Sequence, residues 1–178
     1  MTRKVFCLII ISVLVLLSCS CNSVMTQSTT SLMTVITTPP APPLVPDDAY
    51  YFDLGGIIIV PGSEYPSAFL PMEDTSYAIP SADGERNNKV YCFTGVEITT
   101  YTDEYMAEYV QSIYLMDDSV QTPESISIGD SINHAISVYG SPANTEYDTI
   151  LYQKGKTNLE IIAVDGIITS IEYRLIHD

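Results

Sequence analysis

One serine in this chain stands in a setting where nucleophilic chemistry could occur. Ser131 lies in Gly129-Asp130-Ser131-Ile132, a Gly-Asp-Ser block of the kind that carries the nucleophile in some hydrolases. An activated serine needs a histidine that an aspartate orients, typically from three residues before it. The residue three before His177 is Arg174, and Ser131 itself is three before His134. The block is therefore better explained as the N-cap of a helix, where Ser and Asp accept backbone N–H bonds.

The chain also lacks the common sequence signatures of other catalytic and metal-binding sites. The chain has no Gly-x-Ser-x-Gly, His-Glu-x-x-His, Cys-x-x-Cys or phosphate-binding loop. Carboxylates cluster in two turns and could gather oxygen ligands for calcium, but their spacing is not that of an EF-hand loop. These carboxylates belong to Asp103, Glu104, Glu108, Asp117 and Asp118. We therefore predict a protein that is not an enzyme and that uses no metal and no cofactor.

Residues 1–18 have the three parts of a signal peptide. Arg3 and Lys4 supply the positive start, residues 8–17 form an apolar run, and small residues follow. The run is shorter than the roughly 20 apolar residues that a membrane-spanning helix needs. We predict that residues 1–18 are a lipoprotein signal peptide.

The end of this segment carries a second kind of chemistry. Leu16-Leu17-Ser18-Cys19 resembles the bacterial lipobox, in which the cysteine receives diacylglycerol before cleavage. The resemblance implies lipidation of Cys19 and a membrane anchor on the outer face of the bacterial cytoplasmic membrane. Two acyl chains suffice for stable attachment. Cys21 is the fallback acceptor, although Ser18 then stands where a branched apolar residue belongs.

Residues 19–48 are predicted to be a tether that follows the lipidated cysteine. The segment is rich in Ser, Thr and Pro and ends TTPPAPPLVPDD. Such a composition cannot bury a core, and its prolines favour extended polyproline conformations. At about 3 Å per residue, residues 22–48 reach at most about 80 Å from the membrane.

The acidic balance of the chain restricts its partners. The 178 residues carry 22 acidic and seven basic side chains, a formal net charge of −15. Without Arg3 and Lys4, five basic residues face 22 acidic ones, and the net charge is −17. An acidic surface repels phosphate backbones, so we predict no nucleic-acid partner. Only Cys92 lies in the expected folded region, where we predict a small buried side chain in a strand.

Residues 122–142 begin a clearly marked structural unit. Asp130 or Ser131 is predicted to cap a helix that ends at Gly140. Apolar residues recur at i, i+3, i+4 and i+7, and His134 falls on the opposite, solvent-facing side. These apolar residues are Ile132, Ala135, Ile136 and Tyr139. Strands are predicted at 149–153, 157–164 and 167–175, joined by turns at Lys154-Gly155 and Asp165-Gly166.

A looser version of the same pattern precedes this unit. A strand at 57–60 is followed by a short helix, which Ser63 caps, Pro66 does not break and Pro71 ends. Residues 72–88 show no clear period and are predicted to be irregular. Three strands are then predicted at 89–94, 96–101 and 109–116.

The two units align with each other. Residues 110–115 match residues 168–173 at an offset of 58, and residues 60–63 match 128–131 at an offset of 68. We therefore predict an α+β fold of two tandem repeats, 49–121 and 122–178. Each repeat is a short helical segment packed on an antiparallel sheet of three to four strands.

The segments 87–101, 110–121 and 122–140 are similar to a group of lipoproteins from Gram-positive gut-type bacteria whose function is not known. They read NNKVYCFTGVEITTY, VQSIYLMDDSVQ and TPESISIGDSINHAISVYG. Those proteins resemble tandem repeats of the β-lactamase-inhibitor-protein-like (BLIP-like) fold, which implies a helical segment on a curved antiparallel sheet. The resemblance covers residues 52–173 and implies no activity.

Thirteen tyrosines and no tryptophan indicate where a partner could bind. Strand tyrosines on an uncovered sheet face would form an amphipathic contact surface, although about half are expected to pack inward. The strand candidates are Tyr91, Tyr101, Tyr114, Tyr152 and Tyr173. Tyr77, Tyr91 and Tyr114 are the predicted interface residues.

We predict a membrane-tethered extracellular lipoprotein that acts as a non-enzymatic binding module. The partner is expected to be a protein or a component of the cell envelope. Two alternatives remain at this point, a hydrolase that acts on envelope material and an inhibitor of a secreted enzyme.

Overall fold

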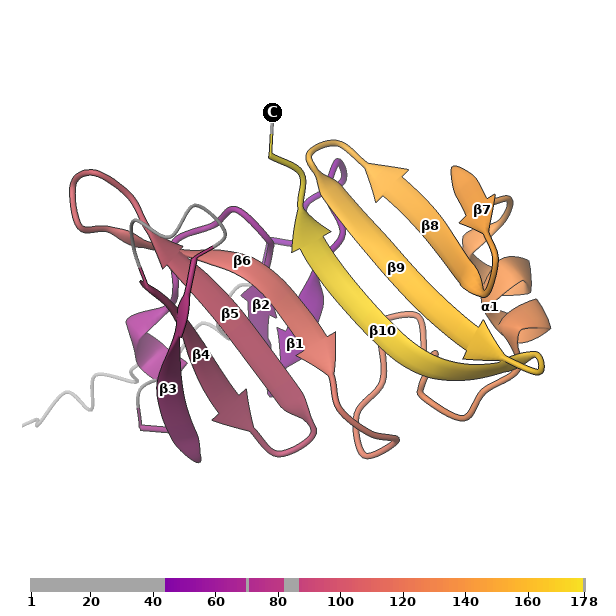
Figure 1. The fold of residues 1–178 in the computed structure, drawn as a ribbon, viewed down its shortest axis with the longest axis horizontal. Coiled ribbons are helices and arrows are strands. Elements are labelled where there is room, and N and C mark those ends of the chain that lie inside the picture. The colour runs from indigo at the N-terminus through magenta and orange to yellow at the C-terminus, as the bar shows by residue number, and fades with distance from the viewer. Residues whose placement is uncertain (1–43, 70, 82–86, 178) are drawn as a thin grey trace, which may run out of the picture. The chain divides into compact units, whose positions relative to one another are not determined.

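The structure, a computed structural model, describes residues 44–69, 71–81 and 87–177. The expected signal peptide, Cys19, Cys21 and most of the tether lie outside these residues. The described chain is mainly antiparallel sheet with one α-helix, which confirms the predicted α+β class. Eight of the described strands run side by side as one curved layer, and two others form a separate hairpin (Figure 1).

Eight strands form the main sheet, in the order β3-β4-β5-β6-β10-β9-β8-β7. Every neighbouring pair is antiparallel. The strands are β3 (Thr75–Pro80), β4 (Asn87–Phe93), β5 (Val96–Thr102), β6 (Glu108–Leu115), β7 (Asn144–Glu146), β8 (Thr149–Lys154), β9 (Thr157–Val164) and β10 (Ile167–Leu175). The two halves of the chain thus meet where β6 pairs with β10.

Four smaller elements lie against one face of this sheet (Figure 1). They are the hairpin of β1 (Phe52–Leu54) and β2 (Ile57–Ile59), the 3-10 helix η1 (Ser67–Phe69) and the α-helix α1 (Ile132–Tyr139). Phe52, Ile59, Phe69 and Ala135 bring these elements into the same hydrophobic core.

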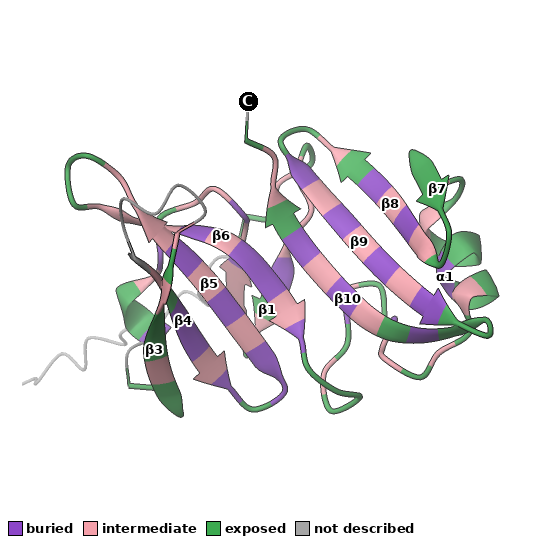
Figure 2. Cartoon of the chain, in the orientation of Figure 1, coloured by how far each residue is buried: buried purple, intermediate pink, exposed green. Residues whose placement is uncertain are grey.

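The core follows from the period-2 alternation of the strands. One row of cross-strand partners is fully or almost fully buried and runs Tyr91, Ile98, Ile113, Tyr173 and Leu159. Figure 2 shows buried residues alternating with more exposed ones along β5 and β9. Each such aliphatic or aromatic side chain contributes roughly 1.5–3 kcal/mol by leaving water.

Helix α1 has the predicted ends. The hydroxyl of Ser131 accepts a hydrogen bond from the backbone N–H of Asn133 at 3.2 Å, and Gly140 follows the last turn with φ +82°. Ala135 is fully buried and His134 is exposed, as predicted. Ile136, however, is 38% exposed, so the apolar stripe that contacts the core is narrower than expected.

Two local predictions were wrong in the first half of the chain. Residues 75–80, within the segment expected to be irregular, form β3, which pairs with β4 over six residues. The sequence of β3, TSYAIP, lacks a clear period, and pairing at the sheet edge makes it a strand. The helix expected after Ser63 is only η1, and the Ser63 hydroxyl donates to the carbonyl of Val60 at 2.8 Å instead of capping it.

Ile126 is buried in the loop before α1, where its backbone N–H donates to the hydroxyl of Thr122. One further difference from the predictions concerns the second half. The short edge strand β7 was not predicted, since Asn, Thr and Glu carry no strand pattern.

Candidate functional site

The sheet face opposite the core elements carries a continuous row of cross-strand partners. The row runs Thr75, Cys92, Glu97, Tyr114, Glu172, Glu160, Leu151 and Asn144, with one residue from each strand. Tyr114 has a glutamate on each side. Glu172 and Glu160 are direct partners of like charge, and Arg174 lies 3.1 Å from the Glu172 carboxylate. We call this surface the open face.

A β-bulge shapes the open face within β6. Val110 pairs with Thr100 and Ser112 pairs with Thr99, so Gln111 is an extra residue between them. Regular alternation would send Gln111 and Ser112 to opposite faces. The bulge instead lets both side chains line one hollow, while Val110 packs in the core.

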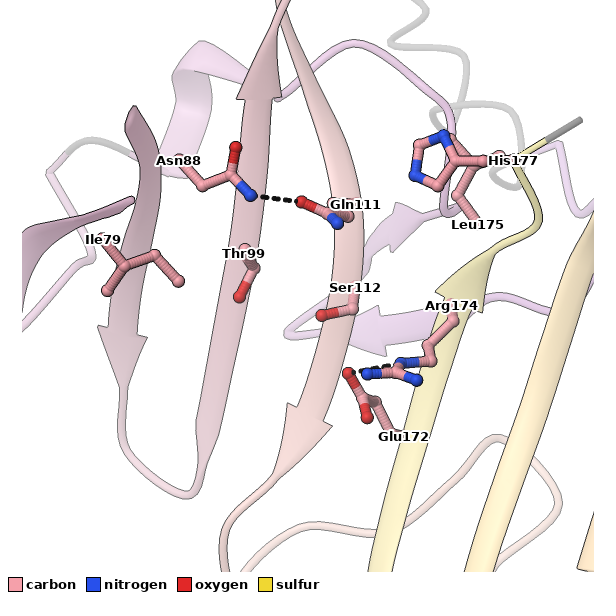
Figure 3. Close-up of a pocket in the computed structure, with 9 residues that line it drawn as sticks. All are labelled: Ile79, Asn88, Thr99, Gln111, Ser112, Glu172, Arg174, Leu175 and His177. Carbon is pink, nitrogen blue, oxygen red and sulfur yellow. Dashed lines mark hydrogen bonds and ion pairs between the residues drawn. The ribbon is translucent and has the colours of Figure 1, made fainter. Parts of the chain in front are cut away.

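The hollow encloses about 410 Å³. Nine residues of β3, β4, β5, β6, β10 and the segment after β10 line it (Figure 3): Ile79, Asn88, Thr99, Gln111, Ser112, Glu172, Arg174, Leu175 and His177. The β6–β10 pairing ends at Ser112 and Arg174, next to the bulge. Beyond that point Leu175 and His177 form the wall opposite Gln111 (Figure 3).

Two amide side chains are held together in the hollow. The Asn88 side-chain nitrogen donates to the Gln111 side-chain oxygen at 2.7 Å (Figure 3). This bond leaves the Asn88 carbonyl oxygen as an acceptor group and the Gln111 nitrogen as a donor group at one place. The hollow therefore offers both kinds of hydrogen-bonding group.

Aromatic rings border the hollow on the side of His177. The rings of Tyr101 and Tyr109 stack with centroids 5.7 Å apart, and His177 meets Tyr101 edge-on at 5.9 Å. Burial, followed by the nearby Tyr109 and Asp103, raises the pKa of Tyr101. These rings form an apolar patch beside polar groups.

The three predicted interface tyrosines lie in different environments. Tyr77 is 47% exposed on the edge strand β3, and Tyr114 is half-buried on the open face. Tyr91 is 1% exposed and belongs to the core row, so its ring does not reach a partner as predicted. The cause is strand parity, since Tyr91 pairs with buried Ile98.

Tyr91 is held by a partly buried polar cluster. Its ring stacks on Tyr65 at 4.2 Å, and its hydroxyl donates to Glu108 at 2.9 Å and accepts from Lys89 at 2.7 Å. The hydroxyl of Thr100 also donates to Glu108, at 2.5 Å. Burial raises the pKa of Tyr91, and the Lys89 bond opposes this effect. Tyr91 is thus a structural residue.

Other candidate groups have structural partners. Ser131 caps α1, and Asp103 accepts backbone N–H bonds from Tyr105 and Ala107 in its turn. Burial and the neighbouring Glu97 raise the pKa of the half-buried Cys92 thiol. In residues 44–69, 71–81 and 87–177, no three His, Cys, Asp or Glu side chains are grouped to hold a metal ion.

Comparisons with protein-family models, curated proteins and solved structures found no match to this chain. Within the part of the chain that the structure describes, no helix is both long and apolar enough to cross a membrane.

Sequence reasoning missed the hollow and its residues, including Asn88, Gln111, Glu172 and Arg174. A signal for the bulge was nevertheless present. Val110-Gln111-Ser112-Ile113 places two polar residues between core residues, where a regular strand would have one.

Proposed function

We propose that this chain is a membrane-tethered extracellular lipoprotein that acts as a non-enzymatic binding module. In this proposal the open face holds a protein or a component of the cell envelope. One observation carries it: β1, β2, η1 and α1 cover a single face of the sheet, and the other face carries the hollow and Tyr114. An antiparallel sheet with one uncovered face presents a large surface without exposing its core.

The negative charge of the open face restricts the class of partner that can bind there. Glu97 and Glu172 flank Tyr114 directly, and Glu160 follows in the same row. The whole chain is also acidic, with a net charge of −15. Neutral or basic partners are therefore favoured over anionic polymers such as nucleic acids.

We further propose that the chain contains two BLIP-like repeats, 49–121 and 122–178. The mirrored strand order, β3-β4-β5-β6 followed by β10-β9-β8-β7, supports the proposal. Bulges at equivalent places support it as well. Gln111 is the extra residue in β6 and Thr169 is the extra residue in β10, at the predicted offset of 58.

The segments before the two sheets supply a second argument for repeats. The N–H of Gly62 donates to the carbonyl of Val110 at 2.7 Å, and the N–H of Gly129 donates to that of Ile168 at 2.8 Å. Both glycines have positive φ, +92° and +93°. These matching features make Gly62 equivalent to Gly129, which is an offset of 67 residues. The alignment of the two sequences paired residues 60–63 with 128–131, an offset of 68.

The binding proposal is tested by crosslinking in intact cells. A photoreactive amino acid replaces Tyr114 on the open face, and a control variant carries it at Val138, which is 41% exposed on α1, on the covered side of the sheet. We expect a specific crosslinked species from position 114 and none from position 138. Equal labelling from both positions, or none from position 114, would contradict a partner on the open face.

A second assay addresses catalysis. The full chain is incubated with a panel of ester, peptide and glycan substrates. We expect no turnover, and hydrolysis that scales with protein concentration and survives further purification would overturn the non-enzymatic assignment.

A further inference from the structure

The hollow on the open face combines groups that suit a ligand rich in hydroxyls. Asn88 and Gln111 contribute amide groups, and Thr99 and Ser112 contribute hydroxyls. Amides and hydroxyls offer donors and acceptors together, and a ligand hydroxyl is itself both donor and acceptor. A purely apolar ligand would leave these polar groups unsatisfied, at a cost of roughly 1–3 kcal/mol for each buried group.

The polar groups are pre-positioned. Three strands carry them, and the Asn88–Gln111 hydrogen bond of 2.7 Å fixes the two amides relative to each other. Ser112 is only 9% exposed, and pairing with Thr99 and Arg174 fixes its backbone in the sheet. Fewer side chains then need to be ordered when a ligand binds, which favours affinity.

The walls of the hollow suit the less polar side of a sugar ring. Ile79 and Leu175 are apolar, and His177 extends the wall toward the stacked Tyr101 and Tyr109 rings. The C–H groups of a sugar ring carry a partial positive charge and pack favourably on the negative face of an aromatic ring. A flat ligand that is edged with hydroxyls therefore matches both the amide and hydroxyl groups of the hollow and its wall of Ile79, Leu175 and His177.

The negative charge around the hollow disfavours ligands that are rich in hydroxyls but also anionic. Arg174 pairs with Glu172 at 3.1 Å, so this ion pair adds no net charge to the hollow. Glu160 is the next residue in the row beyond Glu172, and the chain as a whole is strongly acidic. Carboxylated or phosphorylated saccharides would therefore be repelled.

We propose that this hollow binds the neutral, hydroxyl-rich end of a saccharide. The volume of about 410 Å³ falls in the range of small-molecule sites, roughly 300–1,000 Å³. The inference rests on the proposed function, because it names the envelope component that the open face would hold.

The test uses the full-length chain in mild detergent and calorimetric titration. The probes are neutral oligomers of glucose, galactose and N-acetylglucosamine, with oligogalacturonate as the anionic counterpart. We expect at least one neutral oligomer to bind and oligogalacturonate not to bind. Binding of oligogalacturonate alone, or of no neutral oligomer, would overturn the proposal.

Variants locate the site. We expect Gln111→Ala and Asn88→Ala to weaken binding of the neutral oligomer at least tenfold while the melting temperature identifies any loss of folding. The matched control is Thr169→Ala, which alters the bulge residue of β10 away from the hollow and should leave affinity unchanged. Equal effects of the three variants would place the saccharide elsewhere.

The titration and the crosslinking experiment together distinguish a failure of the saccharide assignment from a failure of the proposed function. If no oligomer binds but crosslinking at position 114 still captures a partner, the saccharide assignment fails and the binding module stands. If both experiments fail, the open face is not a binding surface.

Discussion

Tyr114 and Glu172 are direct cross-strand partners at the junction of β6 and β10. The pairs on either side of them are Leu115 with Ile171 and Ile113 with Tyr173, and all four of these side chains are fully buried. One face of the junction therefore belongs to the core and the other to the open face. Because the junction joins the two halves of the chain into one sheet, its surface charges bear on stability and on binding.

The pair Glu172 and Glu160 predicts a stabilising substitution. Like charges directly opposite each other on a sheet are destabilising, by up to about 1 kcal/mol. We expect Glu160→Gln to raise the free energy of unfolding by a few tenths of a kcal/mol at low salt, and added salt to remove the gain. Denaturant unfolding measures it. Glu104→Gln, in an exposed turn, controls for the change in total charge and should do less.

Gly140 and His134 test the register of α1. Gly140 has φ +82° and ψ −155°, a region almost restricted to glycine, and nothing lies within 4 Å of an added Cβ. Gly140→Val should therefore destabilise through backbone strain alone, by more than about 1 kcal/mol. His134→Ala should be nearly silent because the side chain is exposed. Equal shifts in melting temperature would show that the helix is wrongly placed.

Alanine substitution at the three predicted interface tyrosines should affect stability and binding differently. Tyr91→Ala removes a buried ring and its bond to Glu108, and we expect a loss of about 3–5 kcal/mol. Tyr77→Ala and Tyr114→Ala should cost less, because both rings are partly in water. Once a partner is captured, its affinity should fall for these two variants. Unchanged affinity for both would remove tyrosine contacts from the proposed interface.

Buried and partly buried tyrosines predict a loss of stability in alkali. Burial is the main cause that raises the pKa of Tyr65, Tyr139 and Tyr173 above the ordinary value of 10.0. Above that pH the unfolded chain releases these protons and the folded chain keeps them, so the folded state binds more protons. The free energy of unfolding must then fall as pH rises.

Denaturant unfolding between about pH 9 and about pH 12 measures this fall. Tyr139→Phe removes one ionisable group and should make the pH dependence shallower, although it also removes hydrogen bonds to Thr122 and Glu124. A stability that does not change over this range would contradict the burial of these hydroxyls.

The lipobox resemblance predicts which cysteine anchors the chain. We expect Cys19→Ala to abolish lipidation and release the protein from membranes, and Cys21→Ala to leave it attached. Fractionation of cells that express each variant, with a labelled fatty acid, measures both effects. Release by Cys21→Ala alone would reassign the acceptor.

Local sequence determined most of the secondary structure. Asp165 and Gly166 both have positive φ and form the turn between β9 and β10, as an Asp-Gly hairpin requires. Thr94-Gly95 similarly separates β4 from β5. Helix α1 ends at Gly140 because glycine, which has no Cβ, adopts the positive φ and extended ψ of this position without steric cost. These signals are readable because they depend on neighbours within four residues.

Only the tertiary structure decided which face each strand residue occupies and where the hollow lies. β3 becomes a strand through pairing with β4, and Tyr91 enters the core because its register partner is Ile98. Gln111 reaches the hollow because a single bulge changes the parity of β6. A one-residue shift reverses every side chain beyond it, and the energy that selects the register comes from packing between strands and not from the residues of one strand alone.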